Sequence, residues 1–319
     1  MFHSKQQCFN TNISISKLNE MKLKFVLIIS FSLSCLYATA QQTTNYTQYN
    51  NVVMPINTAA SFLTQQPQVN VVGRYQWVDL EGAPTSYRLA ASLPLAKSDL
   101  RVGINLKHET AAVENVGETS VFVGKSVRLA AEDYLALSLG AGVSYYNGNF
   151  SRLSVSDPSF ANDLKETDGM LSASLMYYRP EKFYAGIAVP RLTFSKLGLS
   201  SKAQNYDVNN LYHFTAGAVF ALGNDFDLKP ATLLSYAKNL DFQANFSAMI
   251  YLKKTFGLGA DIRTQGEMAA LASLFVKNLN IGFGYQFATS SNVQNPVFSN
   301  STYEFSLTYR FGKGFGGLL

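Results

Sequence analysis

The residues best suited to catalysis in the mature part of this sequence are two histidines, His108 and His213. A serine hydrolase would combine such a histidine with an acid and with a serine that often lies in a G-x-S-x-G turn. The sequence contains no G-x-S-x-G turn, and its His, Asp and Glu residues lack the spacing typical of metal ligands. We therefore predict no enzymatic activity and no cofactor. We interpret His213 as a polar residue that faces an interior or an interface.

Basic side chains form the second group of candidate functional residues. On the inner wall of a closed structure they would either favour anions or pair with acids and close the path, and the sequence leaves both open. Three G-x-G pairs, the first of them Gly140/Gly142, resemble phosphate loops, but no helix-like segment follows them, so we predict small residues within strands. The candidate charges on polar faces are Arg74, Arg88, Arg101, Arg128, Asp261, Arg263 and Arg310.

The first forty residues have the features of a leader. An apolar run, 25-FVLIISFSLSCLYA-38, follows two lysines and precedes an A-x-A site, which is typical of a secretory signal peptide over residues 21–40. Residues 1–20 then form an upstream extension from a mis-assigned start, and a lipoprotein signal ending at Cys35 is the alternative. Cleavage after Ala40 removes both cysteines, four of the 26 Lys and Arg, and one of the 21 Asp and Glu. The remaining net charge of +2 gives no reason to expect nucleic-acid binding.

After the leader, hydrophobicity alternates with a period of two. In 302-TYEFSLTYRF-311, every second residue from Tyr303 to Phe311 is apolar or aromatic, and the residues between them are polar. Because successive side chains of a strand point to opposite faces, this pattern predicts one apolar and one polar face. Similar segments lie near 69–78, 85–93, 99–108, 118–129, 133–146, 169–178, 182–189, 211–222, 226–236, 241–252, 255–263, 267–276, 278–288 and 301–311.

A membrane barrel accounts for these segments better than a soluble β-sandwich. Sandwich strands average about five or six residues, whereas a membrane-spanning strand needs about 9–11. Charged residues make up only 15% of the chain, and the polar faces are rich in Gly, Ser, Thr, Asn and Gln, as expected for a lumen. Every backbone polar group must be paired in lipid, so the strands must close into a ring. We therefore predict an all-β fold, a transmembrane antiparallel β-barrel of about 14 strands.

Aromatic residues near the segment ends resemble the girdles that lie at the two membrane interfaces. The pairs are Tyr75 and Trp77, Tyr145 and Tyr146, Tyr177 and Tyr178, and Tyr309 and Phe311.

The predicted barrel occupies residues 67–312 and is followed by a short C-terminal tail, 313–319. The preceding segment, 41–66, is rich in Gln, Asn and Thr and forms a polar arm that either plugs the barrel or lies in the periplasm. Two polar stretches, 147–168 and 190–210, are too long for hairpin turns, so we expect extra structure at one end of the barrel.

Four short motifs occur in order along the chain, at Gln48, Tyr49, Asn57 and Ala59; at Arg74, Gln76, Trp77, Gly82, Ala83 and Pro84; at Asp157 and Pro158; and in 182-KFYAGIAVPRL-192. Together they resemble the PorP/SprF family of Bacteroidetes outer-membrane proteins, over about residues 41–311. Thr58 and Ser61 stand where that family has a proline and a glycine, so the first motif need not turn as it does in the family.

The resemblance implies a non-enzymatic component of type IX protein secretion and gliding motility in the cell outer membrane. The partners that it implies are outer-membrane lipid, periplasmic lipoprotein and ring components of the secretion system, and a secreted adhesin or enzyme cargo, with no nucleic acid. An outer-membrane solute or lipid transport channel is the alternative function, and a barrel enzyme that uses His213 is a third.

Overall fold

The structure is a computed structural model that describes residues 46–78, 80–95, 99–152, 162–199, 210–238, 241–264, 266–288, 301–312 and 317–319. The predicted leader, residues 1–40, and the motif positions Asp157 and Pro158 lie outside the described residues. Within the described ranges, no helix is both long and apolar enough to cross a membrane.

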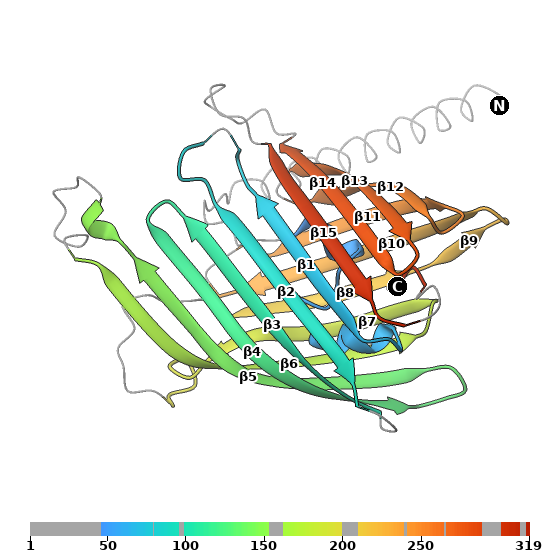
Figure 1. The fold of residues 1–319 in the computed structure, drawn as a ribbon, viewed down its shortest axis with the longest axis horizontal. Helices are drawn as coiled ribbons and strands as arrows, with labels where there is room; N and C mark the ends of the chain where they lie inside the picture. Colours follow the sequence, from blue (N-terminus) through green and yellow to red (C-terminus); the bar gives the residue numbers. More distant parts are fainter. Residues whose placement is uncertain are drawn as a thin grey trace, which may run out of the picture. The chain divides into compact units, whose positions relative to one another are not determined.

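The strands form a closed antiparallel ring (Figure 1). Most strands pair with their sequence neighbours, and β1 (Gln68–Tyr75) pairs with β15 (Thr302–Arg310) to close the ring. The short β9 (Phe220–Leu222) continues β8 (Leu211–Ala218) along the same partner strand, so the barrel has 14 spanning strands. The others are β2 (Thr85–Pro94), β3 (Leu100–Ala111), β4 (Glu114–Arg128), β5 (Tyr134–Gly148), β6 (Leu164–Arg179), β7 (Phe183–Thr193), β10 (Phe226–Ala237), β11 (Gln243–Leu252), β12 (Phe256–Arg263), β13 (Glu267–Val276) and β14 (Leu279–Ala288).

The predicted segments correspond one to one with these strands, and the predicted barrel is confirmed. The main differences lie in β3 to β7, where several strands are longer than the alternation indicates. β3 and β4 continue to a tight turn at Ala112 and Val113, and β6 begins at Leu164, paired with Gly148 of β5. The added residues are mostly polar, so they show no continuous apolar face in the sequence, and cross-strand pairing reveals them.

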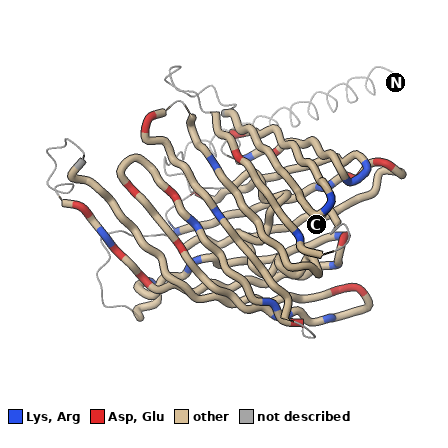
Figure 2. The backbone as a smooth tube through the Cα atoms, viewed as in Figure 1, with Lys and Arg blue, Asp and Glu red and all other residues tan. Residues whose placement is uncertain are grey.

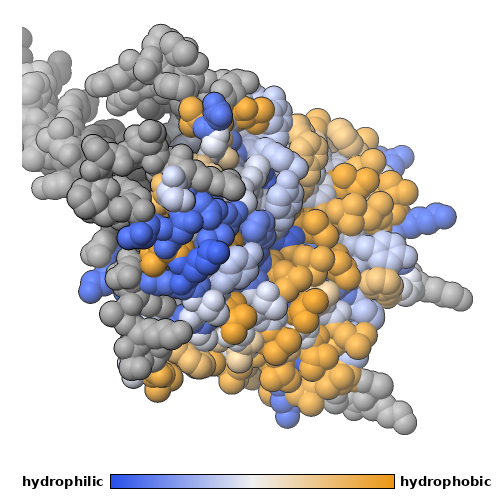
Figure 3. Space-filling model, turned by 60° about the vertical axis from the view of Figure 1, so that its left-hand side comes forward, coloured by the Kyte–Doolittle hydropathy of each residue, from blue (hydrophilic) through white to orange (hydrophobic). Residues whose placement is uncertain are grey.

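Inward and outward faces alternate as predicted. On β5, Leu139 is 52% exposed on the outside of the ring, whereas its neighbour Ser138 is 1% exposed on the inside. Charged residues are sparse along the strands (Figure 2), and hydrophobic side chains cover a broad area of the outer wall (Figure 3). This outer face is the one that lipid would contact.

Only one member of each adjacent tyrosine pair faces outward, which corrects the predicted girdle. Tyr145 and Tyr177 are exposed, but Tyr146 and Tyr178 point into the ring and are buried. Neighbouring residues of a strand lie on opposite faces, so two adjacent tyrosines cannot both contact a membrane interface. At Trp77 the chain has already left β1 and adopts a positive φ of 47°.

The two ends of the barrel differ in their connections. At the end that we call the short-turn end, strands are joined by residues 95–99, 129–133, 180–182, 223–225, 253–255 and 277–278. At the opposite, long-loop end, the connections include 149–163, 194–210 and 289–301.

Residues 46–66 lie inside the ring and are called the N-terminal plug below (Figure 1). Two 3-10 helices, η1 (Thr47–Asn50) and η2 (Thr58–Leu63), form part of it, and a third, η3 (Phe150–Arg152), lies outside the ring after β5. The plug begins beside Ser86, near the long-loop end, and ends where β1 begins, at the short-turn end. The polar arm that the sequence left unplaced is therefore in the lumen over its described part.

Candidate functional site

The candidate site is the lumen, where wall and plug meet through buried polar contacts. Glu304 of β15 is central to it and is 1% exposed. Its carboxylate accepts hydrogen bonds from the backbone N–H groups of Thr47 (3.1 Å) and Gln48 (2.6 Å) at the start of η1. The start of a helix carries unpaired N–H groups and partial positive charge, so a carboxylate is stabilising there.

Arg74 of β1 completes this arrangement from the neighbouring strand. Its guanidinium donates to Glu304 at 3.1 Å and to the Gln286 side chain at 2.9 Å. Arg74 and Glu304 face each other in the register of β1 and β15, so strand pairing alone brings them together. Two predicted motif positions, Gln48 and Arg74, thus meet through a glutamate that sequence reasoning did not single out. The sequence feature that could have identified Glu304 is its position as an acidic residue on the polar face of the last strand.

Tyr49 anchors the plug on β12, three strands from β15 around the ring. Its hydroxyl donates to the Asp261 carboxylate at 2.8 Å, and Arg263 lies 3.5 Å from the same carboxylate. Arg263 also donates to Glu267 at 2.8 Å. Burial, together with the negative charge of Asp261, raises the pKa of Tyr49 well above its ordinary value, so this phenol stays protonated and remains a donor.

Several lumen cations donate to carbonyl groups of the plug. Arg88 of β2 and Asn105 of β3 donate to the Pro55 carbonyl at 2.8 and 3.2 Å. Arg101 donates to the carbonyl of Thr64 and, at 3.1 Å, to that of Gln66. Arg88 and Arg101 therefore lie in the lumen as the alternation predicts, but their partners are backbone atoms rather than acids.

The middle of the plug lies against β5, β6 and β7. The Asn57 side chain caps η2 by accepting from Ala59 N–H at 3.0 Å, and it donates to the carbonyls of Leu175 and Ile187. The Thr58 hydroxyl lies 2.9 Å from the hydroxyls of both Ser138 and Ser174. The small inward residues of these strands therefore leave space for the plug and also bind it.

Glycines on the inner wall allow the plug to approach closely. A Cβ at Gly282 would lie 2.5 Å from Gln48 Oε1, and one at Gly186 would lie 2.8 Å from Asn57 Nδ2. Gly282 belongs to one of the three G-x-G pairs and is buried within β14, as predicted for small lumenal residues. Sequence reasoning left open whether residues 41–66 plug the barrel, and in the structure Gln48 of this segment lies against Gly282.

The family-like stretch 182–192 also faces the plug. Tyr184 is buried in a cluster with Ala59, Ala60 and Phe62 of the plug. Pro190 lies in an irregularity between Ala188 and Arg191 where the register of β7 shifts. A proline cannot donate to the ladder and is tolerated at such a bulge.

The bulge turns Arg191 into the lumen, where its guanidinium donates to Glu118, which also lies 3.9 Å from Lys107. Strict alternation from Tyr184 places Arg191 on the lipid face, so this group of charges could not be predicted.

The described C-terminal residues, Gly317–Leu319, fill the lumen at the short-turn end. Arg310 donates to the carbonyls of Gly317 (2.8 Å) and Leu319 (3.0 Å). Lys229 of β10 donates to the Leu318 carbonyl and, at 2.6 Å, to that of Asn50 in the plug. Lys229 was not predicted, although its polar-face position in β10 was a signal.

One predicted lumen charge does not lie in the lumen. Arg128 is exposed and donates to the carbonyls of Ala130 and Ala131, so its predicted lumenal position is wrong. The reason is that β4 extends past β3, whose pairing with β4 begins at Lys125.

The β1–β2 turn contains five of the predicted motif positions: Gln76, Trp77, Gly82, Ala83 and Pro84. A 3.0 Å hydrogen bond from Gln76 N to Pro84 O closes this turn, and Gly82 packs on Ala112 of the β3–β4 turn.

The geometry offers no catalytic constellation among the described residues. His213 is buried with its Nδ1 2.9 Å from the Ser235 hydroxyl, and none of the hydrogen bonds between described residues joins either of them to an acidic side chain. In the part of the chain that the structure describes, no group of three His, Cys, Asp or Glu residues could bind a metal ion.

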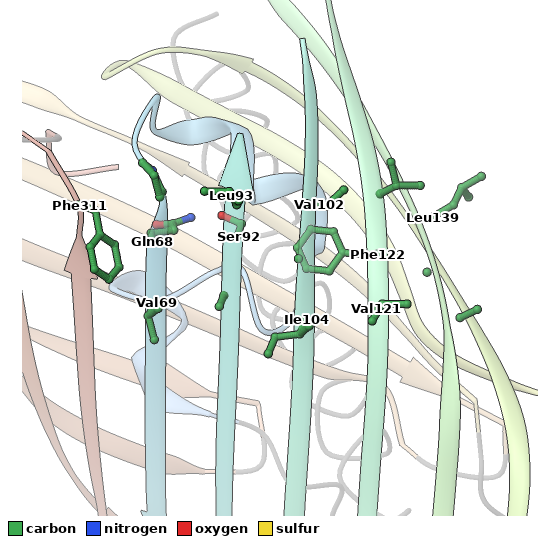
Figure 4. Close-up of a pocket in the computed structure, with 16 residues that line it drawn as sticks. Gln68, Val69, Ser92, Leu93, Val102, Ile104, Val121, Phe122, Leu139 and Phe311 are labelled. Atoms are coloured by element: carbon green, nitrogen blue, oxygen red, sulfur yellow. The ribbon is translucent and has the colours of Figure 1, made fainter. Parts of the chain in front are cut away.

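A groove of about 1080 Å³ lies on the outer wall, from Phe311, which follows β15, across β1 to β5 (Figure 4). Val69, Ile104, Val121 and Leu139 line it, and all four belong to the outward face. Such a surface is suited to the acyl chains of lipid rather than to a polar substrate.

The fold and the filled lumen define a plugged transmembrane β-barrel of the outer-membrane type. The chain belongs to the PorP/SprF family, because the profile described as type IX secretion system membrane protein PorP/SprF matches residues 38–309. It is accordingly an outer-membrane protein of type IX secretion.

Other comparisons are distant. No curated protein matches the sequence. Among solved structures, the Acinetobacter baumannii outer membrane protein Omp33 is 10% identical, with a TM-score of 0.43 over 78% of this chain and 99% of that chain. The KdgM porin is 10% identical, with a TM-score of 0.38 over 77% and 99%. BamA of Haemophilus ducreyi lacking POTRA domains 1–3 is 10% identical, with a TM-score of 0.43 over 77% and 71%.

Proposed function

We propose that this chain is a non-enzymatic scaffold barrel that supports export or surface anchoring of an adhesin or enzyme cargo, in secretion and in gliding motility. It acts with periplasmic lipoprotein or ring components of the secretion system. The observation that carries the proposal, beside family membership, is the occupied lumen: the plug and Gly317–Leu319 lie where a solute would have to pass. This favours a scaffold over a solute or lipid channel.

The test is deletion of the gene in a host that has type IX secretion. We expect at least one adhesin or secreted enzyme to fall about tenfold or more at the cell surface, measured by quantitative mass spectrometry of surface-labelled protein. Affinity purification from outer membranes should recover periplasmic secretion components with the barrel. An unchanged surface proteome in the deletion strain would contradict the proposal.

A complementing His213→Ala variant distinguishes the scaffold from an enzyme. We expect full rescue, because His213 contacts only Ser235 among the side-chain hydrogen bonds described. Loss of rescue by a variant that is folded and present at normal levels would favour the enzyme.

We further propose that residues 21–40 are a signal peptide cleaved after Ala40. Sequencing of the N-terminus of the mature protein tests this proposal.

A further inference from the structure

Beside the side-chain contacts described above, a second set of contacts joins the wall to the main chain of the plug. Glu304 binds two N–H groups, Ser174 binds the N–H of Ala59 at 3.0 Å, and Lys229 binds the carbonyl of Asn50. Arg88, Asn105 and Arg101 bind further carbonyls, as described above. These side chains come from β2, β3, β6, β10 and β15, so they surround the plug. Main-chain contacts of this kind bind a polypeptide with little dependence on its sequence, and pockets for side chains add specificity.

The plug is bound without being part of the barrel. Its described residues include the two 3-10 helices η1 and η2 and make no strand pairing with the wall. It joins β1 at the short-turn end, whereas at the other end the Tyr46 ring rests on Arg88, 4.7 Å from the guanidinium carbon to the ring centroid. Each contact can therefore be released in turn from the Tyr46 end without disturbing the strands.

An empty lumen would be costly. Glu304, Lys229, Arg88 and Arg101 are all buried, and each of them makes at least one hydrogen bond to the plug. Removing the partner of a buried charge is strongly destabilising, whereas exchanging it for another donor or acceptor is not. Any release of the plug should therefore be coupled to entry of another polypeptide that offers the same N–H and C=O groups.

We propose that the lumen is a binding site for a polypeptide segment, occupied in cis by the plug, and that a segment of a secreted protein replaces the plug from the Tyr46 end. The incoming segment carries small and polar side chains, because the glycine notches at Gly186 and Gly282 admit the polar ends of Asn57 and Gln48. This inference rests on the proposed function and specifies how cargo contacts the barrel.

A reversible covalent lock tests the exchange. In the variant T58C/S174C, the two thiols replace hydroxyls that lie 2.9 Å apart between plug and β6. The matched control is T85C/T110C, whose hydroxyls lie 2.6 Å apart between β2 and β3 and do not involve the plug. The chain's own cysteines, Cys8 and Cys35, lie in the predicted leader.

Each variant is expressed in the deletion strain, and surface cargo is measured under oxidising conditions and again after mild reduction. We expect the oxidised T58C/S174C barrel to give about tenfold less surface cargo than its reduced form, with no change in the control. Wild-type display by the fully oxidised lock would overturn the exchange. If the deletion strain itself keeps its surface cargo, the proposed function fails; if deletion loses cargo and the locked barrel restores it, only this inference fails.

A second measurement applies if the double variant is inactive in both states. The single variant Thr58→Cys is labelled in intact cells with a membrane-impermeant maleimide. Thr58 is buried in the resting barrel, so labelling reports departure of the plug. We expect labelling to rise at least threefold when cargo is produced, relative to a strain lacking the cargo gene. Equal labelling in the two strains would overturn the proposal.

Discussion

Individual buried charges in this protein interact with groups that are far apart in sequence. Glu304 and its partners Thr47, Gln48 and Arg74 come from three separate parts of the chain, and each contact is shielded from water. A charge pair of this kind contributes little when it is compared with apolar residues of similar size, but loss of one partner leaves the other charge buried and unpaired. The residue-scale prediction concerns that asymmetry.

Replacing Glu304 by alanine should lower the free energy of unfolding by about 3–5 kcal/mol, because Arg74 then stays buried without its carboxylate. The measurement is denaturant unfolding in detergent micelles, followed by the fluorescence of Trp77, the only tryptophan.

The control for Glu304→Ala is Glu132→Ala, which breaks an exposed pair with Lys182 at 3.3 Å. It should change the free energy of unfolding by less than about 1 kcal/mol. Similar losses in the two variants would show that Glu304 does not have the structural role described above.

At the scale of single strands, the environment of a side chain depends on its face and on its depth in the membrane. β4 illustrates both, because Val121 and Val127 share the outward face and are 60% and 50% exposed. Val121 lies in the middle of the wall, paired with Ile104 and Ala141, whereas Val127 is the last residue but one of its strand.

Arginine at these two positions should therefore have different costs. Val121→Arg should destabilise the barrel by about 2–4 kcal/mol, because its charge would lie near the middle of the bilayer, and Val127→Arg by about 0–1 kcal/mol, because it lies near the membrane surface. Folding into lipid vesicles at graded denaturant concentrations measures both values. Equal costs would show that the membrane does not cross the wall at the level of Val121.

β7 shows how one irregularity changes the face of the residues that follow it. The register shift around Pro190 places Arg191 inside, beside Glu118, and the residues after the bulge keep that inverted phase. A single proline within an alternating run therefore decides whether a charge contacts lipid or the lumen.

For the molecule as a whole, the main feature is that the ring encloses its own chain. The plug occupies the lumen along its length, and Arg310 and Lys229 bind residues 317–319 at one mouth. Barrels with somewhat more strands leave an aqueous channel, so a ring of 14 strands needs such a filling to be closed.

The purified protein should therefore show no steady conductance in planar lipid bilayers. A variant lacking residues 46–63 should conduct, because removal of the plug leaves a lumen lined by polar and charged side chains. Correct folding of the variant is checked by gel electrophoresis in detergent. At room temperature, a folded barrel resists unfolding under these conditions. A steady open channel in the intact protein would support the transport alternative and contradict a closed lumen.

Much of this architecture is encoded locally and was therefore predictable. The alternation in segments such as 302–311 and 135–146 defines the strands and their faces, because side chains alternate across any strand. Closure into a ring follows from the need to pair every backbone group in lipid, which does not depend on which residues are present. Even the lumenal positions of Arg74, Arg88, Asp261 and Arg263 follow from their faces alone.

Only the tertiary structure decided what those lumenal residues bind. Alternation alone predicts a mild effect for Ser138→Arg, yet Ser138 contacts Thr58 of the plug, and no pattern around either residue indicates the other. The sequence left residues 41–66 as either a plug or a periplasmic arm, because its polar composition suits water and a polar lumen equally. The choice depends on whether the closed ring presents donors and acceptors at the right places, such as Glu304 for Gln48 and Lys229 for Asn50. Those positions exist only once distant strands have paired.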